Sequence, residues 1–391
     1  MTEEKNNKPS KDLPLGFVDR QEKELLIRDL IISNIKEVMI KYGFQYLETP
    51  SFEYSDSIGK FLPDKDRPDE GVFSFKDENK WLSLRYDLTA PLARYVAKNY
   101  LEIPKPFKRY QLGTVWRNEK PGPGRFREFL QFDADFVGTK SLQADAELCV
   151  MISEILEKCG LSKSEYTIKI SSRKITEELF QKININENQQ KLTVLRALDK
   201  IDRLGWDGVK KLLGAGRKDK SGDFTKGANL KAKDIETIEE TLKKKLPDTQ
   251  DLVEILKIFK DYNFNNFEFD PSVIRGLEYY TGAIFEVNLK FDVTNNKGQV
   301  IQFGSIGGGG RYDNLVNNFG NFDAPATGIS IGIDRLVYAL MQKKEFKVKQ
   351  SKPVVICVFN NNSMKEYINV QLILRKAGIS AEIYPGESKL K

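Results

Sequence analysis

The chain has 391 residues, of which 40% are hydrophobic and 30% charged, and its 62 basic and 56 acidic side chains leave a net charge of only +6. This length allows two or three domains, and the balance is typical of a folded globular enzyme. The sequence contains no histidine. That excludes Ser-His-Asp and Cys-His nucleophile systems, HExxH zinc sites and imidazole acid–base catalysis. Any chemistry must use carboxylates, lysine, arginine, tyrosine, backbone groups or the substrate itself.

Cysteine usage and the N-terminal residues bear on the compartment. Cys149, Cys159 and Cys357 form no CxxC pair, which favours a reduced, cytoplasmic protein. No apolar stretch reaches the roughly 18 residues that a membrane helix requires. Residues 1–15 have no apolar core of the signal-peptide kind and are expected to form a disordered tail.

The first predicted element of the folded part of the chain is a helix. Apolar residues recur at helical spacing from Arg20 to Tyr42, and the pattern ends at Gly43, which suits a helix C-cap. Strand-like runs follow, and a helix begins near Thr89 among them. The runs lie at 44–50, 71–75, 81–85, 110–116 and 129–137. The last two flank the loop sequence KPGPGR, which predicts a hairpin with a long polar loop, and a helix over 144–158 comes next.

Residues 182–270 differ in character from the sequence around them. Lysine and acidic side chains interleave there with Leu and Ile at helical period, which predicts a mainly helical insertion. It divides a core made of residues 16–181 and 271–341, and the second part holds strand-like runs at 283–289 and 300–303 and a helix over 334–341. Because hairpins rather than regular βαβ crossovers join the strands, we expect an α+β core with an antiparallel sheet flanked by helices.

The C-terminal residues form a separate unit. Residues 342–352 are a lysine-rich linker, and residues 353–391 contain one strand–helix–strand pattern, with a helix over 363–377. About 40 residues cannot bury much core by themselves. We therefore expect an incomplete α/β domain, or one that docks on another surface.

The densest signal for a functional site is the predicted hairpin. Arg117, Arg125 and Arg127 concentrate positive charge on its two sides, and Glu119 lies among them. Such crowding is costly unless an anion sits among the guanidinium groups, whose geometry suits phosphate oxygens. The alternative is a surface hairpin with ordinary ion pairs.

Two glycine-containing stretches add weaker signals. Gly307 to Gly310, followed by Arg311, lets the backbone approach a ligand closely, although glycine runs also make turns and bulges. No Walker motif occurs. The stretch GISIGIDRL alternates like a buried strand and places Arg335 in the first turn of a helix, where it opposes the helix dipole. A bound anion or aromatic base would explain that arginine, and so would a pair with Asp334.

A further stretch, RGLEYYTG, places Arg275 between apolar residues just before Tyr279 and Tyr280. A buried tyrosine pair more often belongs to a core than to a site, and the adjacent arginine favours a functional role. In the insertion, the cluster Lys210, Lys211, Arg217, Lys218 and Lys220 is a local basic patch. We favour a solvated helical surface over nucleic-acid binding as the explanation of this patch.

Taken in order, these stretches resemble the class II aminoacyl-tRNA synthetases. FQYLETP is similar to motif 1, WRNEKPGPGRFREF to motif 2 and GISIGIDRL to motif 3. RGLEYYTG and GGGGRYDNLV resemble signature segments of histidyl-tRNA synthetases, and SLRYDLTAPLARYVA and LQFDADFVG fit the same family. The resemblance runs from about Gly16 to the end of the chain and is least distinctive in the insertion.

The resemblance implies a role for individual residues. It places Arg275 and Arg117 on the α-phosphate as catalytic groups, and Arg275 also on the substrate carboxylate. It implies that ATP is bound by Arg117, Glu119, Arg125, Arg127, Phe129, Arg311 and Arg335, with adenine between Phe129 and Arg335. It implies that histidine is held by Asp87, Leu88, Thr89, Gln131, Asp135, Tyr279 and Tyr280, with Asp135 and Tyr280 on the imidazole.

The implied reaction is the ATP-dependent activation of L-histidine to histidyl-adenylate and its transfer to the 3′ end of tRNA(His), with Mg²⁺ bridging the ATP phosphates. The attacking carboxylate is already ionised at pH 7, so a protein without histidine can catalyse this step by positioning and by cations on the phosphate. The family also implies a homodimer. The C-terminal unit resembles only the first part of an anticodon-binding domain, which leaves anticodon contact open.

Two other functions compete with this interpretation. A non-catalytic synthetase-like subunit that regulates an ATP phosphoribosyltransferase resembles the same core, but it does not need the arginines that face ATP phosphates. A purely nucleic-acid-binding module predicts a basic stripe that the near-neutral charge does not show.

Overall fold

The structure is a computed structural model that describes residues 10–59, 71–218, 222–274, 279–295, 297–301, 303–343, 346 and 352–384. Arg275 and Lys220 lie outside the described residues, as do residues 1–9 of the predicted tail. Residues 10–15 are exposed. No described helix combines the length and the apolar character needed to cross a membrane.

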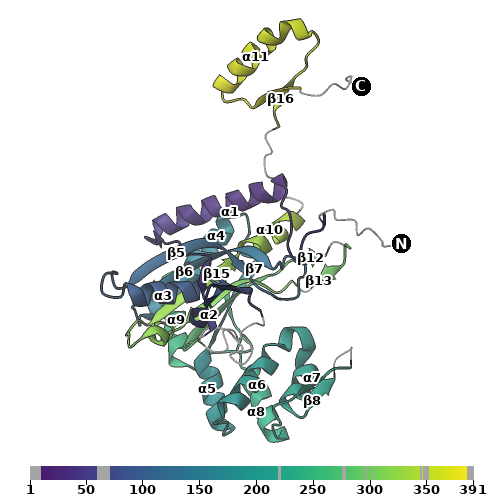
Figure 1. Cartoon of the computed structure of the whole chain (residues 1–391). Coiled ribbons are helices and arrows are strands. Elements are labelled where there is room, and N and C mark those ends of the chain that lie inside the picture. The colour runs from purple at the N-terminus through teal and green to yellow at the C-terminus, as the bar shows by residue number, and fades with distance from the viewer. Residues whose placement is uncertain are drawn as a thin grey trace.

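An eight-stranded sheet forms the centre of the described residues (Figure 1). Its order is β1-β5-β6-β15-β14-β11-β7-β10, and all neighbours are antiparallel except the parallel edge pairs β1–β5 and β7–β10. The strands are β1 (Gln45–Tyr46), β5 (Phe107–Trp116), β6 (Glu128–Val137), β7 (Tyr166–Ser172), β10 (Phe267–Phe269), β11 (Ala283–Leu289), β14 (Ser305–Arg311) and β15 (Ala326–Gly332). This confirms the predicted antiparallel α+β fold.

Helices cover one face of the sheet and close the main hydrophobic core. The apolar side of α1 (Glu22–Lys41) packs beside α4 (Leu142–Lys158) and α10 (Ile333–Gln342), and α4 packs in turn beside α9 (Gln250–Asp261). Fully buried Ile31, Ile35 and Met39 of α1 show why the helical spacing predicted this element well. On the other face lie α3 (Thr89–Lys98) and η1 (Val316–Phe319), which pack together around a smaller core.

A small antiparallel sheet of order β2-β4-β3 stands beside α2 (Ser55–Gly59). Its strands are β2 (Phe52–Tyr54), β3 (Ser74–Asp77) and β4 (Lys80–Leu84). The predicted strand 44–50 is reduced to β1, because the carbonyl oxygens of Thr49 and Pro50 accept hydrogen bonds from Arg85 Nη1, at 2.7 and 3.5 Å, in place of strand partners. The predicted strand 300–303 is β13 (Val300–Ile301), which pairs with β12 (Val293–Thr294) outside the central sheet.

The helical region carries its own hydrophobic core, which extends from Leu179 in α5 to Ile238 in α8 and includes Ile274. It contains α5 (Arg173–Lys182), α6 (Asn188–Leu198), α7 (Ile201–Leu213), β8 (Gly216–Lys218), β9 (Phe224–Lys226) and α8 (Ala232–Leu242). The range predicted for the insertion, 182–270, does not coincide with this core, which begins at Leu179 and includes Ile274. Leu252 and Phe259 of α9 pack in the main core, and β10 extends the central sheet, so both belong with the sheet by packing.

The C-terminal unit contains β16 (Val354–Ile356), η2 (Asn361–Ser363), α11 (Met364–Lys376) and β17 (Ala381–Ile383), with the two strands parallel. This matches the predicted strand–helix–strand pattern. Figure 1 shows α11 and β16, in yellow, set apart from the central sheet.

Candidate active site

Alternation along β5 and β6 builds the floor of the site. The register pairs Arg109 with Asp135, Gln111 with Asp133 and Gly113 with Gln131. Because successive side chains of a strand point to opposite faces, these residues share the face away from α1 and α4, while their even-numbered neighbours enter the main core. A chain of polar groups is thereby placed on an otherwise apolar sheet.

A cavity of about 490 Å³ opens over this face. It brings together segments from the hairpin, the end of β4, the glycine strands and the helical region. Among the predicted site residues, it is lined by Asp87, Thr89, Arg117, Glu119, Arg125, Phe129, Gln131, Asp135, Tyr279, Tyr280 and Arg335. Sequence positions as far apart as Tyr86 and Arg335 therefore meet in one place.

Glycines keep the floor of the cavity flat. Gly310 of β14 pairs with Gly328 of β15, Gly308 pairs with Ser330, and Gly328 lies opposite Asp135 on its other side. A Cβ atom at Gly328 would overlap Asp135 Oδ1, and one at Gly310 would lie 2.5 Å from the carbonyl oxygen of Ala283. The glycine run was not predicted as a strand, but it pairs with β11 and β15. Glycine is needed there because the neighbouring backbones lie too close to leave room for side chains.

The floor concentrates carboxylates. Asp133 and Asp135 are each 2% exposed, and Asp87 lies beside them at the start of α3, where its Oδ1 accepts a hydrogen bond from Ala90 N (3.0 Å). Burial and the neighbouring Asp135 raise the pKa of Asp133 to about 7. Burial also raises the pKa values of Asp87 and Asp135. Such a cluster is suited to a cationic or proton-donating ligand.

Arg109 partly balances these charges. It is fully buried, its Nη2 lies 3.2 Å from Asp135 Oδ2, and it donates to the backbone oxygen of Leu88 (2.8 Å). Leu88 does not line the cavity, and its backbone oxygen contacts the site through this hydrogen bond with Arg109. Gln131 Nε2 donates to Asp133 Oδ1 (2.8 Å), and Thr89 Oγ1 approaches Asp133 Oδ2 at 3.4 Å.

Three tyrosines form one wall. The Tyr312 hydroxyl donates to Asp135 Oδ1, and burial raises the Tyr312 pKa well above its ordinary value, so the hydroxyl stays a donor. The ring of Tyr279 packs edge-on against Tyr312, with centroids 6.1 Å apart. The Tyr279 and Tyr280 hydroxyl oxygens are 3.5 Å apart. The wall thus places phenol groups next to the carboxylates.

Arg117 stands at the rim, just after β5. Its Cζ lies 4.5 Å from the ring centre of Tyr86 and 5.2 Å from that of Phe129, and its Nε donates to the Tyr86 carbonyl (3.2 Å). Glu119 accepts from the Tyr86 hydroxyl (3.2 Å). The hairpin therefore presents a cation, an acceptor and aromatic faces to the cavity, and a guanidinium group in such a place suits phosphate oxygens.

The hairpin loop is fixed by hydrogen bonds within it and by a contact with Phe303. Gly122 and Arg125 exchange two backbone hydrogen bonds of 2.8–2.9 Å, and Gly124, with φ +63°, packs against Phe303. Arg127 does not line the cavity, since its Nε donates to the Glu119 carbonyl (3.0 Å).

Arg335 lies on the opposite rim, at the start of α10. It stacks 4.4 Å from the ring centre of Phe303 and donates to the Ser305 carbonyl (2.9 Å). Asp334, the partner considered from the sequence, instead binds Arg20 at 2.8 Å and accepts a hydrogen bond from Leu130 N.

Arg311 does not line the cavity, although the resemblance implied that it binds ATP. Its side chain leaves β14 toward α4, where it forms a buried ion pair with Asp145 and donates to the carbonyls of Thr139 and Ser141, both at 3.0 Å. The strand alternation that sends Tyr312 into the site sends Arg311 to the other side.

Sequence reasoning missed Asp133, Arg109 and Tyr86 as site residues. Asp133 could have been found, because it lies two residues from both Gln131 and Asp135 and so shares their face of the strand. Arg109 carries only the weak signal of an arginine within an apolar strand. Tyr86 enters the site through its contact with Arg117, which no local pattern predicts.

A family model described as Histidyl-tRNA synthetase matches residues 16–336 of the chain. The chain belongs to the histidyl-tRNA synthetase family. Among curated relatives, the histidine–tRNA ligase of Bartonella quintana is 49% identical, over 99% of this chain and 84% of that protein. The histidine–tRNA ligase of Rhizobium meliloti is 47% identical, over 99% of this chain and 82% of that protein.

Solved structures agree with this family assignment. A histidyl-tRNA synthetase from Nostoc sp. PCC 7120 superposes with a TM-score of 0.73 at 25% identity, covering 98% of this chain and 88% of that chain. A Bacillus halodurans structure titled as an ATP phosphoribosyltransferase regulatory subunit/histidyl-tRNA synthetase gives 0.71 at 23% identity, covering 96% and 93%. At that identity the second likeness shows the shared fold.

Proposed function

We propose that this chain is a histidine–tRNA ligase, which activates L-histidine with ATP and transfers it to the 3′ end of tRNA(His). The observation that carries the proposal is one cavity with two chemically distinct ends: a carboxylate and phenol floor, and a rim of arginines and aromatic rings. Identities of 47–49% to histidine–tRNA ligases over 99% of the chain support the same activity.

The floor suits histidine. The α-ammonium group of an amino acid needs anionic acceptors, which Asp87 and Asp133 supply, and an imidazole needs partners for both ring nitrogens. Asp135 and Tyr280 are the groups that we assign to the ring. An apolar side chain of similar size would leave these buried polar groups unpaired, so the site discriminates strongly against it.

The rim suits ATP. Phe129 and Arg335 offer flat surfaces for adenine, and we assign the α-phosphate to Arg117. The histidine carboxylate oxygen attacks the α-phosphorus while the bond to the pyrophosphate oxygen breaks, which gives histidyl-adenylate and pyrophosphate. A hydroxyl of the terminal tRNA ribose then attacks the carbonyl carbon, and AMP leaves. Positioning and charge stabilisation suffice, so no histidine is needed.

Other assignments from the resemblance remain proposals. We assign Arg275 to the substrate carboxylate and the α-phosphate, and Arg125 and Arg127 to the neighbourhood of the phosphates or the tRNA end. No three acidic or thiol groups converge as metal ligands among the described residues. We therefore assign Mg²⁺ to the phosphate oxygens of ATP, which it prefers, as part of the substrate.

The domain arrangement and setting are likewise part of the proposal. We assign residues 16–181 and 271–341 to the catalytic core, 182–270 to an insertion that holds most of the separate helical core as well as α9 and β10, and 353–391 to part of an anticodon-binding domain. We place the protein in the cytoplasm, where tRNA is charged.

We also propose a homodimer, because the described residues leave an apolar surface exposed on the sheet β2-β4-β3. Phe52, Phe75 and Trp81 are 49%, 44% and 56% exposed, and Phe52 and Phe75 pack edge to face with centroids 5.4 Å apart. A cluster of large exposed aromatic rings marks a protein interface more often than a solvated surface.

The regulatory-subunit alternative is less well supported. It explains a histidine pocket, but not the retained rim at Arg117 and Arg335. Charging of a tRNA(His) transcript with radioactive histidine tests the proposal directly. A ligase charges this transcript and not an alanine transcript; a protein that binds histidine, charges nothing and stimulates an ATP phosphoribosyltransferase would establish the alternative.

A further inference from the structure

The guanidinium group of Arg311 has a complete set of acceptors. Its Nε and Nη2 both donate to Asp145 Oδ2, its Nη1 donates to the Thr139 carbonyl (3.0 Å) and to Asp313 Oδ1 (3.3 Å), and its Nη2 also donates to the Ser141 carbonyl (3.0 Å). These contacts use all five N–H groups of an arginine. Arg311 is 5% exposed and Asp145 fully buried. The side chain is thus committed to the protein and not to a ligand.

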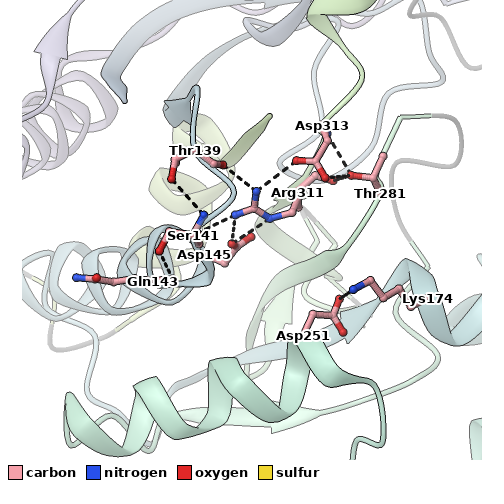
Figure 2. Close-up of polar contacts among 9 residues, drawn as sticks. All are labelled: Thr139, Ser141, Gln143, Asp145, Lys174, Asp251, Thr281, Arg311 and Asp313. Carbon is pink, nitrogen blue, oxygen red and sulfur yellow. Dashed lines mark hydrogen bonds and ion pairs between the residues drawn. The ribbon is translucent and has the colours of Figure 1, made fainter. Parts of the chain in front are cut away.

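Three segments meet at this group (Figure 2). Thr139 and Ser141 belong to the turn between β6, which carries Asp135, and α4, which carries Asp145. Arg311 itself ends β14 and immediately precedes Tyr312. The carboxylate of Asp313, which contacts Arg311, also accepts from Thr281 Oγ1 (2.9 Å).

The contact between Asp313 and Thr281 links the two segments that carry the tyrosines of the wall. Thr281 N donates to the Arg311 carbonyl (2.8 Å), and Asp313 N donates to Thr281 Oγ1 (3.1 Å). Gly282 lies against the methylene groups of Arg311, where a Cβ atom would come within 3.2 Å of Arg311 Cδ. Tyr280, next to Thr281, is thereby held in a fixed relation to Tyr312.

We propose that Arg311 is a positioning residue for histidine recognition: it locks β14 onto the turn after β6, so that the Tyr312 hydroxyl stays on the carboxylate of Asp135. The inference rests on the proposed function, because it assigns the effect to the histidine end of the cavity. It replaces the direct ATP contact that the sequence predicted for Arg311.

Lysine cannot reproduce this arrangement, although it keeps the charge. It has three donors on one nitrogen, whereas the site requires a planar fork that reaches two carboxylates and two carbonyls. Arg311→Lys therefore weakens the connection between β14 and the turn after β6, while Asp145 keeps a cation beside it.

The test combines Arg311→Lys with Tyr312→Phe, which removes the hydroxyl on Asp135 and keeps the ring. In histidine-dependent ATP–pyrophosphate exchange with the full chain, each single variant raises the KM for histidine about tenfold and leaves the KM for ATP within about twofold. In the double variant, Arg311→Lys adds less than about twofold, because the bond through which it acts is already absent.

Several outcomes overturn the inference. Equal increases in the two KM values, an increase for ATP alone, or effects that multiply in the double variant each assign Arg311 another role. Lys343→Gln, which removes an ion pair with Glu165 away from the cavity, is the control and leaves both KM values unchanged.

Two measurements keep the test informative. If Arg311→Lys does not fold, Thr281→Val, which removes the bond to Asp313 with little change in shape, takes its place and is expected to raise the KM for histidine about threefold. If the unmodified chain shows no exchange, the proposed function fails. The histidine affinities of the unmodified chain, the two single variants and the double variant are then measured by calorimetry and compared in the same way. An unchanged affinity in both single variants overturns the inference.

Discussion

Asp133 is the residue whose surroundings differ most from those of an ordinary surface carboxylate. It is buried between Gln131 and Asp135, and no ion pair reaches it among the described residues. Arg109 faces Asp135 instead. The histidine end of the cavity therefore has more carboxylates than cations among the described residues, and a bound α-ammonium group balances them. Affinity for the substrate and a cost in stability arise from the same carboxylate.

The pH dependence of stability follows from this. The pKa of Asp133 is about 7 in the folded protein against an ordinary value of 3.8, so the folded state holds an extra proton between these values. Stability contributed by this group falls as pH rises from about 4 to about 7 and stays low above that. Asp133→Asn removes the carboxylate and stabilises the folded protein by on the order of 2 kcal/mol at pH 8, and by less at pH 5. Urea unfolding at the two pH values measures this; an equal gain at both would contradict it.

Asp135 is expected to act on the amino acid and not on the nucleotide. Asp135→Ala removes the acceptor of the Tyr312 hydroxyl and leaves Arg109 without its carboxylate. The KM for histidine is expected to rise about 100-fold, with the KM for ATP changing less than about threefold. Steady-state exchange with each substrate varied in turn measures both constants. Similar increases in the two would place Asp135 outside the histidine pocket.

At the scale of elements, the sequence predicts what local periodicity determines. The helix beginning near Arg20, the hairpin strands and the antiparallel sheet follow from apolar spacing and turn residues. The glycine strand β14 could not be predicted, because its close approach to β15 is a property of two backbones far apart in sequence. Arg311 was assigned to ATP for a related reason: its motif indicates a functional segment, but only the strand register shows that Arg311 and Tyr312 face opposite sides.

Gly328 in β15 tests the flat floor. Gly328→Ala forces a methyl group against Asp135 Oδ1, which must move away from its place at the cavity. Histidine affinity is expected to fall at least tenfold with the secondary structure retained. Gly122→Ala is a matched control, since no described residue has an atom within 4 Å of its added Cβ atom. Calorimetric titration with histidine compares the two; wild-type affinity in Gly328→Ala would show that the floor tolerates a side chain.

At the scale of the whole molecule, substrate-binding side chains from distant segments must come together while apolar surfaces are kept from water. The aromatic surface on β2-β4-β3 is exposed in the single chain, and we propose that a second copy covers it. Trp81→Glu places a charge at the most exposed ring of that surface. Sedimentation velocity is expected to show a dimer for the unmodified chain and a monomer, or an at least tenfold weaker dimer, for the variant. A monomeric unmodified chain would rule out this interface.

The central claim is that one cavity binds histidine and ATP and joins them. Histidine-dependent ATP–pyrophosphate exchange on the full chain with Mg²⁺ measures this step without tRNA. We expect exchange with histidine and none with the other standard amino acids, because only an imidazole satisfies the carboxylate and phenol floor. A folded protein that binds histidine but catalyses no exchange, or one that exchanges equally with several amino acids, would contradict the account.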